Sequence, residues 1–409
     1  MIHWPDYHDR NPDELLRELC RDALARWQEP VASPLRKHVD SELAVICERG
    51  YARMFLFLLQ TTEVRITECL VRACGALAGS VTAYLLGISD FNPLDHGLLF
   101  ESFIHFRQKS PATPALETSE EGCSAILRQF QGLLGHDRVG IVHDQYWDYI
   151  YLSSVNIRSL CQADWDKDGN LVVGIDWAEA DKLGMLCIAI RKSKMLTALA
   201  DSVKELPPNA LGIPMRPGLT GIPLDDARTY EYLNSRGADT FFALRDNQCA
   251  RGKHPACRNF AELTAFLALN MPHHAERRAL YYGETVNRIA ALADFPVCQK
   301  HLRETRGILL YQEQFTKIVA EISGLPREDA FAAYQSSWKR KSEEVDEWKR
   351  LLIAGGLANG YGVEKLSVIM DCLLAAAQGN LSLKAYCVSQ ALQLYRLAYC
   401  QAHCGPKRQ

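Results

Sequence analysis

The segment from residue 74 to residue 103 contains a turn whose residue types could bind a phosphate group. Gly75, Gly79 and Ser80 are small, and a helix-forming run follows them. Small residues at the start of a helix let backbone N–H groups approach an anion closely. The same residues would also serve a tight contact between a helix and a turn, because glycine adopts backbone conformations that other residues avoid. Both interpretations, a phosphate-binding turn and a packing element, follow from this composition.

Cysteines and histidines occur at spacings that could hold a metal ion. Cys249, His254 and Cys257 lie close together in a polar segment. A closed zinc site needs four ligands, and the candidates for the last one are His273, His274 and Cys298. Because no second paired motif accompanies them, we interpret the segment as a polar loop with free thiols and predict no metal site. The same interpretation applies to a second group, Cys400, His403 and Cys404.

Acidic residues between 164 and 175 superficially match a calcium-binding loop. The last position of such a loop is normally glutamate, and here it is Ile175. The pair Asp168 and Gly169 lies between two apolar runs, which is typical of a tight β-hairpin. We therefore predict two strands joined at this pair, and no calcium site.

Helices and strands must position these residues, and several start signals are visible. Asn11 can cap a helix that begins at Pro12, and apolar periodicity predicts a second helix over 34–49. The segment 54–60 predicts a buried strand or helix, whereas 104–124 predicts a loop or an irregular strand. A connector rich in proline and glycine covers 206–223. Beyond it, helical patterns cover 226–236, 259–269, 276–293, 311–323, 328–353, 363–377 and 382–403.

Composition restricts the class of protein. The chain has 409 residues and a formal net charge of −3, so binding of nucleic acid would have to rely on local basic patches. Its 14 cysteines show no regular spacing, which predicts reduced intracellular thiols. The first residues lack an apolar signal core, and the apolar run 366–377 is short and contains Asp371. We expect a cytoplasmic protein with no membrane segment.

Four longer strings give a more specific signal. They are CGALAGSVTAYLLGISDFNPLDHGLLFESF, FAELTAFLALNMP, LRETRGILLYQEQFTKIVAEISG and LKAYCVSQALQLYRLAYCQAHCGP. In this order they resemble motifs of the C-family DNA polymerases, the alpha subunit of bacterial DNA polymerase III. The resemblance implies an α/β (α+β) fold with a nucleotidyltransferase-type palm and mainly helical thumb and finger regions.

The resemblance also implies a division of the chain. Residues 1–50 would be a helical lead-in, 51–205 a palm with an inserted thumb-like segment, 206–225 a linker and 226–409 a helical finger-like domain. We expect the chain to lack the family's PHP domain, its helix-hairpin-helix region, its clamp-binding segment and its OB-fold.

The family's nucleotidyl transfer needs Mg²⁺ ions held by carboxylates. Depending on register, the first two aspartates of the family correspond to Thr113 and Ala115, or to Ala115 and Glu117. The third aspartate corresponds to Ala189. Because alanine cannot ligate a metal, Glu117 is the only remaining candidate for a catalytic carboxylate. If the site is inactive, we expect no bound cofactor.

Other charged or polar positions of the family are replaced as well. The residues found there are Cys74, Ala76, Cys187, Tyr334, Gln335 and Tyr386. Most of these replacements remove a charge that would stabilise the triphosphate in the transition state. The resemblance therefore implies a catalytically inactive core, in which Gly75, Gly79 and Ser80 form a degenerate phosphate turn.

Basic residues are candidates for contact with DNA. Lys339, Arg340 and Lys341 form a run where the family also has basic residues, and Lys384 is kept from a family motif. The other candidates are Arg303, Arg306, Arg191, Lys192 and Lys194. Acidic residues follow the run, so a solvated helix face with i,i+4 charge pairs explains it equally well.

Three functions remain open at this point. The first is a non-catalytic DNA-binding or scaffold protein in DNA replication or repair. The second is a residual DNA-directed DNA polymerase that uses Glu117. The third is an interaction module without contact to DNA, which regulates an intact polymerase or a defence system. A decaying gene copy is a further interpretation.

Overall fold

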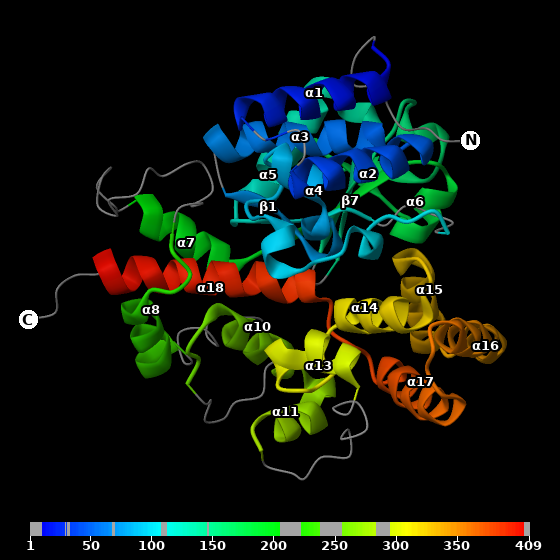
Figure 1. The fold of residues 1–409 in the computed structure, drawn as a ribbon. Coiled ribbons are helices and arrows are strands. Elements are labelled where there is room, and N and C mark those ends of the chain that lie inside the picture. Colours follow the sequence, from blue (N-terminus) through cyan, green and yellow to red (C-terminus); the bar gives the residue numbers. More distant parts are fainter. Residues whose placement is uncertain are drawn as a thin grey trace, which may run out of the picture. The chain divides into compact units, whose positions relative to one another are not determined.

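The computed structural model describes residues 10–28, 30, 33–67, 70–107, 113–144, 147–204, 222–237, 256–283 and 295–404. The chain divides into two compact units (Figure 1). The first unit comprises residues 1–96, 108–222 and 399–409, and the second comprises 97–107 and 223–398. The domain boundaries predicted from the sequence stay predictions. Among the described residues, no helix is long and apolar enough to cross a membrane.

Three helices open the first unit, α1 (Pro12–Arg26), α2 (Pro34–Glu48) and α3 (Ala52–Thr67). Asn11 caps α1 as predicted, because its side-chain oxygen accepts hydrogen bonds from the N–H groups of Asp13 at 2.9 Å and Glu14 at 3.3 Å. The predicted second helix is confirmed by α2. The segment 54–60, predicted to be a strand or a helix, is helical and lies within α3.

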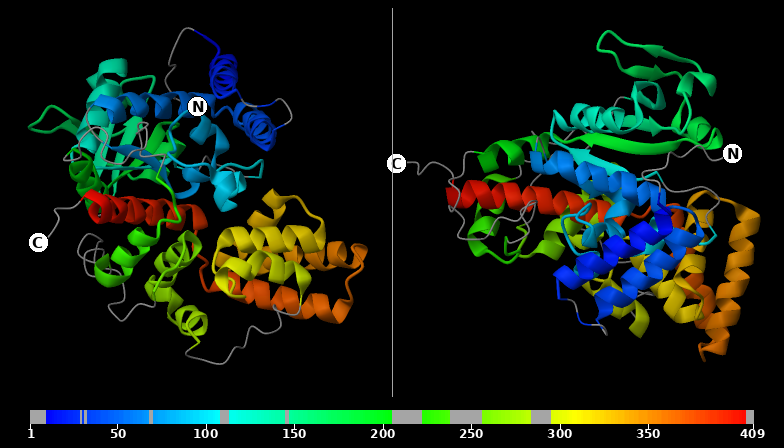
Figure 2. Two further views of the ribbon diagram at one scale, coloured as in Figure 1. Left: turned by 60° about the vertical axis from the view of Figure 1, so that its left-hand side comes forward. Right: turned by 90° about the horizontal axis from the view of Figure 1, so that it is seen from above.

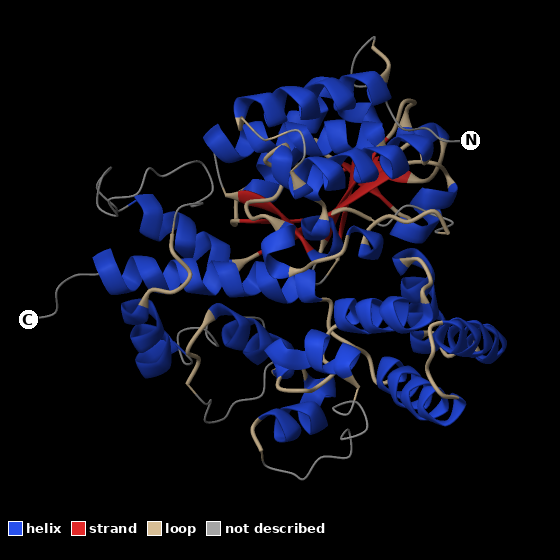
Figure 3. Ribbon diagram, in the orientation of Figure 1, coloured by secondary structure: helices blue, strands red, loops and turns tan. Residues whose placement is uncertain are grey.

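A mixed seven-stranded sheet forms the centre of the first unit (strands red in Figure 3). Its strands are β1 (Val71–Cys74), β2 (Ala115–Thr118), β3 (Val139–His143), β4 (Asp148–Leu152), β5 (Ala163–Trp165), β6 (Leu171–Val173) and β7 (Leu186–Lys192). The spatial order is β1-β2-β7-β4-β3-β6-β5, with β2–β7 and β3–β6 parallel. The antiparallel pair of β5 and β6 confirms the predicted hairpin. The predicted α/β fold class is confirmed.

Side chains alternate between the two faces of this sheet. Helices α3 and α5 (Gly122–Leu134) pack beside each other, with Phe57 and Phe130 in edge-to-face contact at 6.1 Å. Helix α5 contacts β3, β4 and β7, and Asp148 of β4 lies near Cys123 of this helix, so the face that carries Asp148 is the one that α5 covers. The opposite face carries Ala115 and its neighbours. The segment 104–124, predicted to be a loop or an irregular strand, contains both β2 and the start of α5.

The remaining helices of the first unit are α4 (Val81–Leu85), α6 (Trp177–Lys182) and α7 (Lys194–Lys204). The second unit is helical, as predicted. Its main elements are α8 (Ala227–Tyr232), α10 (Phe260–Leu269), α11 (Ala275–Tyr281), α13 (Pro296–Leu302), η8 (Arg303–Thr305), α14 (Gln312–Ser323), α15 (Arg327–Trp338), α16 (Ser342–Ala358), α17 (Val363–Gln378) and α18 (Lys384–Cys404). Helices α14 to α17 lie side by side (Figure 2) around a core that includes Phe315, Leu352 and Leu366.

The prediction of a single helix over 328–353 is wrong. Helix α15 ends at Trp338 and α16 begins at Ser342. Between them Arg340 adopts a φ of +54°, a left-handed conformation that stops the first helix. Helical periodicity continues across this turn, and no glycine or proline marks it. The pattern predicted over 276–293 is helical as far as Tyr281, and its last residues lie outside the described part.

Gly355 allows α16 to approach α14 closely, and replacing it should be costly. A Cβ at this position would lie 2.1 Å from the carbonyl oxygen of Ser323, whereas a Cβ at Gly132 of α5 would meet nothing within 4 Å. We expect Gly355→Ala to lower the free energy of unfolding by about 2 kcal/mol through overpacking. Gly132→Ala should raise it by about 0.5–1 kcal/mol. Equal effects in urea unfolding of the two variants would contradict this packing.

Candidate functional site

The predicted phosphate turn is a tight helical turn, η1 (Gly75–Gly79), between β1 and α4. Gly75 has a φ of +58°, which favours glycine. A Cβ on Gly75 would lie 4.0 Å from the Cβ of Ala115 on β2. Ser80 caps α4, because its Oγ accepts a hydrogen bond from the N–H of Ala83 at 3.1 Å. The turn therefore lies beside a position that the resemblance assigns to a metal ligand.

A carboxylate from α2 occupies the N-terminus of α4. Glu42 Oε1 accepts a hydrogen bond from the N–H of Val81 at 2.7 Å. Its Oε2 accepts one from the N–H of Thr82 at 2.8 Å and one from the hydroxyl of Ser80 at 2.7 Å. A phosphate could bind these donors only by displacing Glu42, because the N–H groups at a helix start are the ones that an anion would use.

The environment of Glu42 shifts its acidity. The side chain is buried, and this burial raises its pKa to about 7, although the hydrogen bonds from Thr82, Val81 and Ser80 counteract part of the effect. Near neutral pH the carboxyl group is therefore present in both charged and neutral forms. The charged form adds a negative charge where a phosphate would have to bind.

The structure brings together Ala115 and Ala189, the two positions that the resemblance assigns to family aspartates. Strands β2 and β7 are parallel neighbours, and Ala115 lies directly opposite Ala189. Magnesium takes oxygen ligands, and these two methyl groups provide none. In the part of the chain that the structure describes, no group of three or more His, Cys, Asp or Glu residues is arranged to hold a metal. The residues at this site do not fit a Mg²⁺ ion.

Glu117 lies in a row of charges across three strands. It is the register partner of Arg72 on β1 and of Arg191 on β7. Its Oε2 is 3.3 Å from Arg72 Nη2, and its Oε1 is 3.4 Å from Arg191 Nη1. Asp90 lies 3.8 Å from Arg72 Nη1. Glu117 is fully buried, and Arg72 and Asp90 are nearly so.

These four side chains compensate one another, with two carboxylates facing two guanidinium groups. Taking a charge out of water is expensive unless it is paired, so the row is stable only as a set. A metal ion would have to compete with Arg72 and Arg191 for Glu117. The last candidate carboxylate is therefore engaged in ion pairs with arginines, at a distance from solvent.

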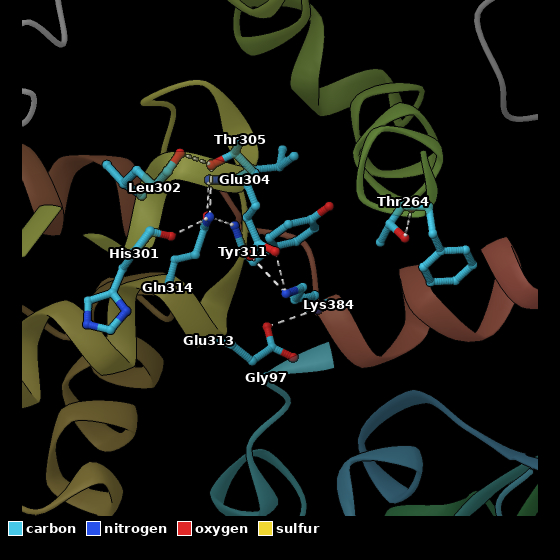
Figure 4. Close-up of polar contacts among 12 residues, drawn as sticks. Gly97, Thr264, His301, Leu302, Glu304, Thr305, Tyr311, Glu313, Gln314 and Lys384 are labelled. Carbon is cyan, nitrogen blue, oxygen red and sulfur yellow. Dashed lines mark hydrogen bonds and ion pairs between the residues drawn. The ribbon is translucent and has the colours of Figure 1, made fainter. Parts of the chain in front are cut away.

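Lys384 begins α18 in the second unit, and it too is buried and paired (Figure 4). Its Nζ is 2.8 Å from both carboxylate oxygens of Glu304 and lies 5.6 Å from the centre of the Tyr311 ring. The carboxylate of Glu313 accepts the N–H groups of Lys384 at 2.9 Å and Ala385 at 3.1 Å. As at Glu42, an internal glutamate thus occupies the start of a helix.

Gln314 belongs to the string YQEQ, and its amide is held at both ends by hydrogen bonds. Its Oε1 accepts the N–H groups of Leu310 and Tyr311, each at 3.0 Å. Its Nε2 donates to the carbonyl of His301 at 3.2 Å and to Thr305 Oγ1 at 2.8 Å (Figure 4). This buried amide uses both its acceptor and its donors to join the turn after α13 to the start of α14. Gln314 therefore holds these segments of the second unit together.

The other predicted nucleic-acid contacts are more exposed. Arg306 Nη2 pairs with Glu262 at 3.1 Å, and its guanidinium lies 4.4 Å from the centre of the Tyr281 ring. Arg303 is exposed in η8. Lys339, Arg340 and Lys341 are exposed at the turn between α15 and α16. Contact of these residues with DNA stays a prediction.

Comparison with known proteins decides the family. Two models match, the bacterial DNA polymerase III alpha NTPase domain over residues 14–144 and the bacterial DNA polymerase III alpha subunit finger domain over residues 195–360. The chain belongs to the bacterial DNA polymerase III alpha family. The resemblance inferred from the sequence is thereby confirmed.

Relatives in this family are distant. DNA polymerase III subunit alpha of Mycobacterium leprae is 22% identical over 88% of the chain and 39% of the relative. The same subunit of Thermus aquaticus is 22% identical over 97% of the chain and 42% of the relative. The error-prone DNA polymerase of Burkholderia mallei is 22% identical over 87% of the chain and 42% of the relative. The chain thus spans about two fifths of the length of these polymerases, between 39% and 42%.

The cysteine and histidine candidates in this family member are only partly described. Cys249 and His254 lie outside the described residues. His274 is buried, with Nε2 2.9 Å from Ser382 Oγ and Nδ1 2.8 Å from Arg277 Nη1. Its burial lowers its pKa to about 3. Cys298 belongs to the hydrophobic core, so neither of these two residues is open to a metal.

Sequence reasoning missed Glu42, Arg72 and Asp90. The helix α2 buries Leu35, Val39, Leu43 and Ile46, and Glu42 lies on the same face as these apolar residues. A glutamate on the apolar face of a helix signals a buried acceptor, so the pattern could have identified it. Arg72 gave a similar signal within the short apolar strand β1. Asp90 lies in a loop and gave none.

Proposed function

We propose that this member of the DNA polymerase III alpha family is a nucleic-acid-binding core that does not incorporate nucleotides. The observation that carries the proposal is the pair Ala115 and Ala189, which lie opposite each other where the family resemblance expects aspartates. The pairing of Glu117 with Arg72 and Arg191 supports it, because the carboxylate two residues after Ala115 is held by these arginines. The core would work in DNA replication or repair in the cytoplasm, without Mg²⁺.

Binding of nucleic acid follows from the family and from local charge. The relatives are named as DNA polymerases, and the net charge of −3 means that local groups of lysine and arginine must provide the attraction. Lys339, Arg340 and Arg303 are exposed candidates for this contact. Lys384 would first have to separate from Glu304, since the two form an ion pair.

A primer-extension assay tests the absence of catalysis. The full chain is mixed with a primer–template, all four deoxynucleotides and either Mg²⁺ or Mn²⁺. We expect no extension, because two carboxylates that hold the metal ions are needed to activate the primer hydroxyl. Template-dependent extension that disappears in Glu117→Gln would instead establish a residual polymerase. A salt-dependent DNA titration completes the test, since absence of binding at low salt would favour a regulator without contact to DNA.

A variant with aspartates restored tests whether the two alanines account for the loss of metal binding. In Ala115→Asp/Ala189→Asp the new carboxylates lie on neighbouring strands about 5 Å apart, close enough to share one cation. We expect Mn²⁺ to raise the unfolding temperature of this variant and not that of the original chain. The variant Ala115→Asn/Ala189→Asn controls for the added volume.

A further inference from the structure

Trp338 is an exposed tryptophan that directly precedes a basic run in the sequence. Its exposed fraction is 47%, and Lys339, Arg340 and Lys341 follow it directly. We call these four residues the tryptophan turn. Trp177 is equally exposed, at 49%, but it lies between Asp176 and Glu179. An indole beside cations can attract an aromatic ligand that carries negative charge, whereas an indole beside carboxylates repels it.

The backbone of the tryptophan turn is strained. Arg340 has a φ of +54° at the position after a helix end that usually holds glycine. Its N–H bonds the carbonyl of Ser337, and the N–H of Lys341 bonds that of Ser336, each at 3.1 Å. Arg306 has a similar φ of +56°, but its side chain is held by Glu262 and Tyr281. Strain of this kind is often kept where a side chain must be presented to a ligand.

The cations of the tryptophan turn differ in their partners. Lys341 Nζ pairs with Glu344 at 2.6 Å. Among the residues that the structure describes, neither Lys339 nor Arg340 forms an ion pair, and both are exposed. Two exposed cations of this turn, Lys339 and Arg340, therefore directly follow an exposed aromatic residue in the sequence. A single strand of nucleic acid matches these side chains, because its phosphates are negatively charged and its unpaired bases expose their faces for stacking.

We propose that the tryptophan turn binds single-stranded nucleic acid, with a base stacked on Trp338 and adjacent phosphates contacted by Lys339 and Arg340. This inference rests on the proposed function and specifies the form of nucleic acid that is bound. Duplex DNA is a poorer ligand for this site, because its bases are already stacked on one another. The turn adds affinity without any contact to a particular base edge, so it is tolerant of sequence.

The test combines a protein variant with a modified strand. A labelled oligothymidylate of about 15 nucleotides and an abasic strand with the same phosphates are titrated with the full chain at low salt. We expect Trp338→Ala to bind the oligothymidylate about tenfold more weakly and the abasic strand as tightly as the original chain does. Trp177→Ala is the matched control and should leave both affinities unchanged. Circular dichroism confirms that each variant is folded.

A second variant tests the phosphate contacts. Lys339→Ala/Arg340→Ala should reduce the slope of log affinity against log salt by about 1.4, since each phosphate contact on a single strand contributes about 0.7. Unchanged binding by Trp338→Ala, an equal loss for both strands, or tighter binding of duplex than of single strands would overturn the inference. Binding of duplex alone would leave the proposed function intact. Absence of binding to any DNA would overturn both.

Discussion

Replacing Glu117 by alanine is expected to lower the free energy of unfolding by about 3–5 kcal/mol. The variant would remove the carboxylate that pairs with buried Arg72 and with Arg191, whose side chain is 16% exposed, while Asp90 would stay 3.8 Å from Arg72. An unpaired charge in the interior cannot recover its hydration, so the loss exceeds that of a simple cavity. Urea unfolding followed by circular dichroism measures the effect.

Glu321 provides a matched control for this prediction. It also contacts two basic side chains, Lys300 at 2.9 Å and His301 at 2.8 Å, but its own side chain is 40% exposed. Glu321→Ala should cost at most about 1 kcal/mol. In Glu117→Ala/Arg191→Ala one charge of each sign is removed, so part of the stability should return. Equal losses in the free energy of unfolding for Glu117→Ala and Glu321→Ala would show that burial does not increase the contribution of the Glu117 ion pairs to stability.

Local signals in the sequence were sufficient for elements that depend on neighbours along the chain. Asn11 marked the start of α1, and the pair Asp168 and Gly169 marked the hairpin of β5 and β6. The turn at Arg340 was missed, because an arginine occupies a conformation that usually requires glycine. The strand β2 was equally difficult to predict, since its four residues are held by pairing with β1 and β7 on both sides.

The candidate site depends on contacts between distant segments, and the sequence predicted it only in part. The family resemblance identified Ala115 and Ala189 as altered positions, but their direct opposition follows from the register of β2 and β7. Glu117 was identified as a carboxylate, whereas its pairing with Arg72 required the register of β1. Periodicity within one segment cannot specify register between segments. The same limit applies to Glu42, whose partners lie about forty residues away at 80–82.

Replacing Glu42 by alanine is expected to lower the free energy of unfolding by about 3 kcal/mol. The change would leave the buried N–H groups of Val81 and Thr82 without an acceptor and would also create a cavity. Asp40 lies on the same helix and is exposed, so Asp40→Ala should cost less than about 0.5 kcal/mol. A loss below about 1 kcal/mol in Glu42→Ala would mean that water replaces the carboxylate at the start of α4.

The pH dependence of stability tests the charge on Glu42 directly. Burial raises the pKa of Glu42 to about 7 in the folded chain, whereas an unfolded glutamate has a pKa of about 4.3. The folded state therefore binds an extra proton at pH values between these two. The contribution of Glu42 to the free energy of unfolding is fully present at low pH and is lost as pH rises through about 7. Each pH unit between the two values corresponds to about 1.4 kcal/mol, which gives a total loss of about 4 kcal/mol, of which about 3 kcal/mol falls between about pH 5 and about pH 8. In Glu42→Gln no proton is exchanged, so the difference in stability from the original chain should change by about this amount between about pH 5 and about pH 8. Parallel pH profiles for Glu42→Gln and the original chain would contradict a raised pKa of Glu42.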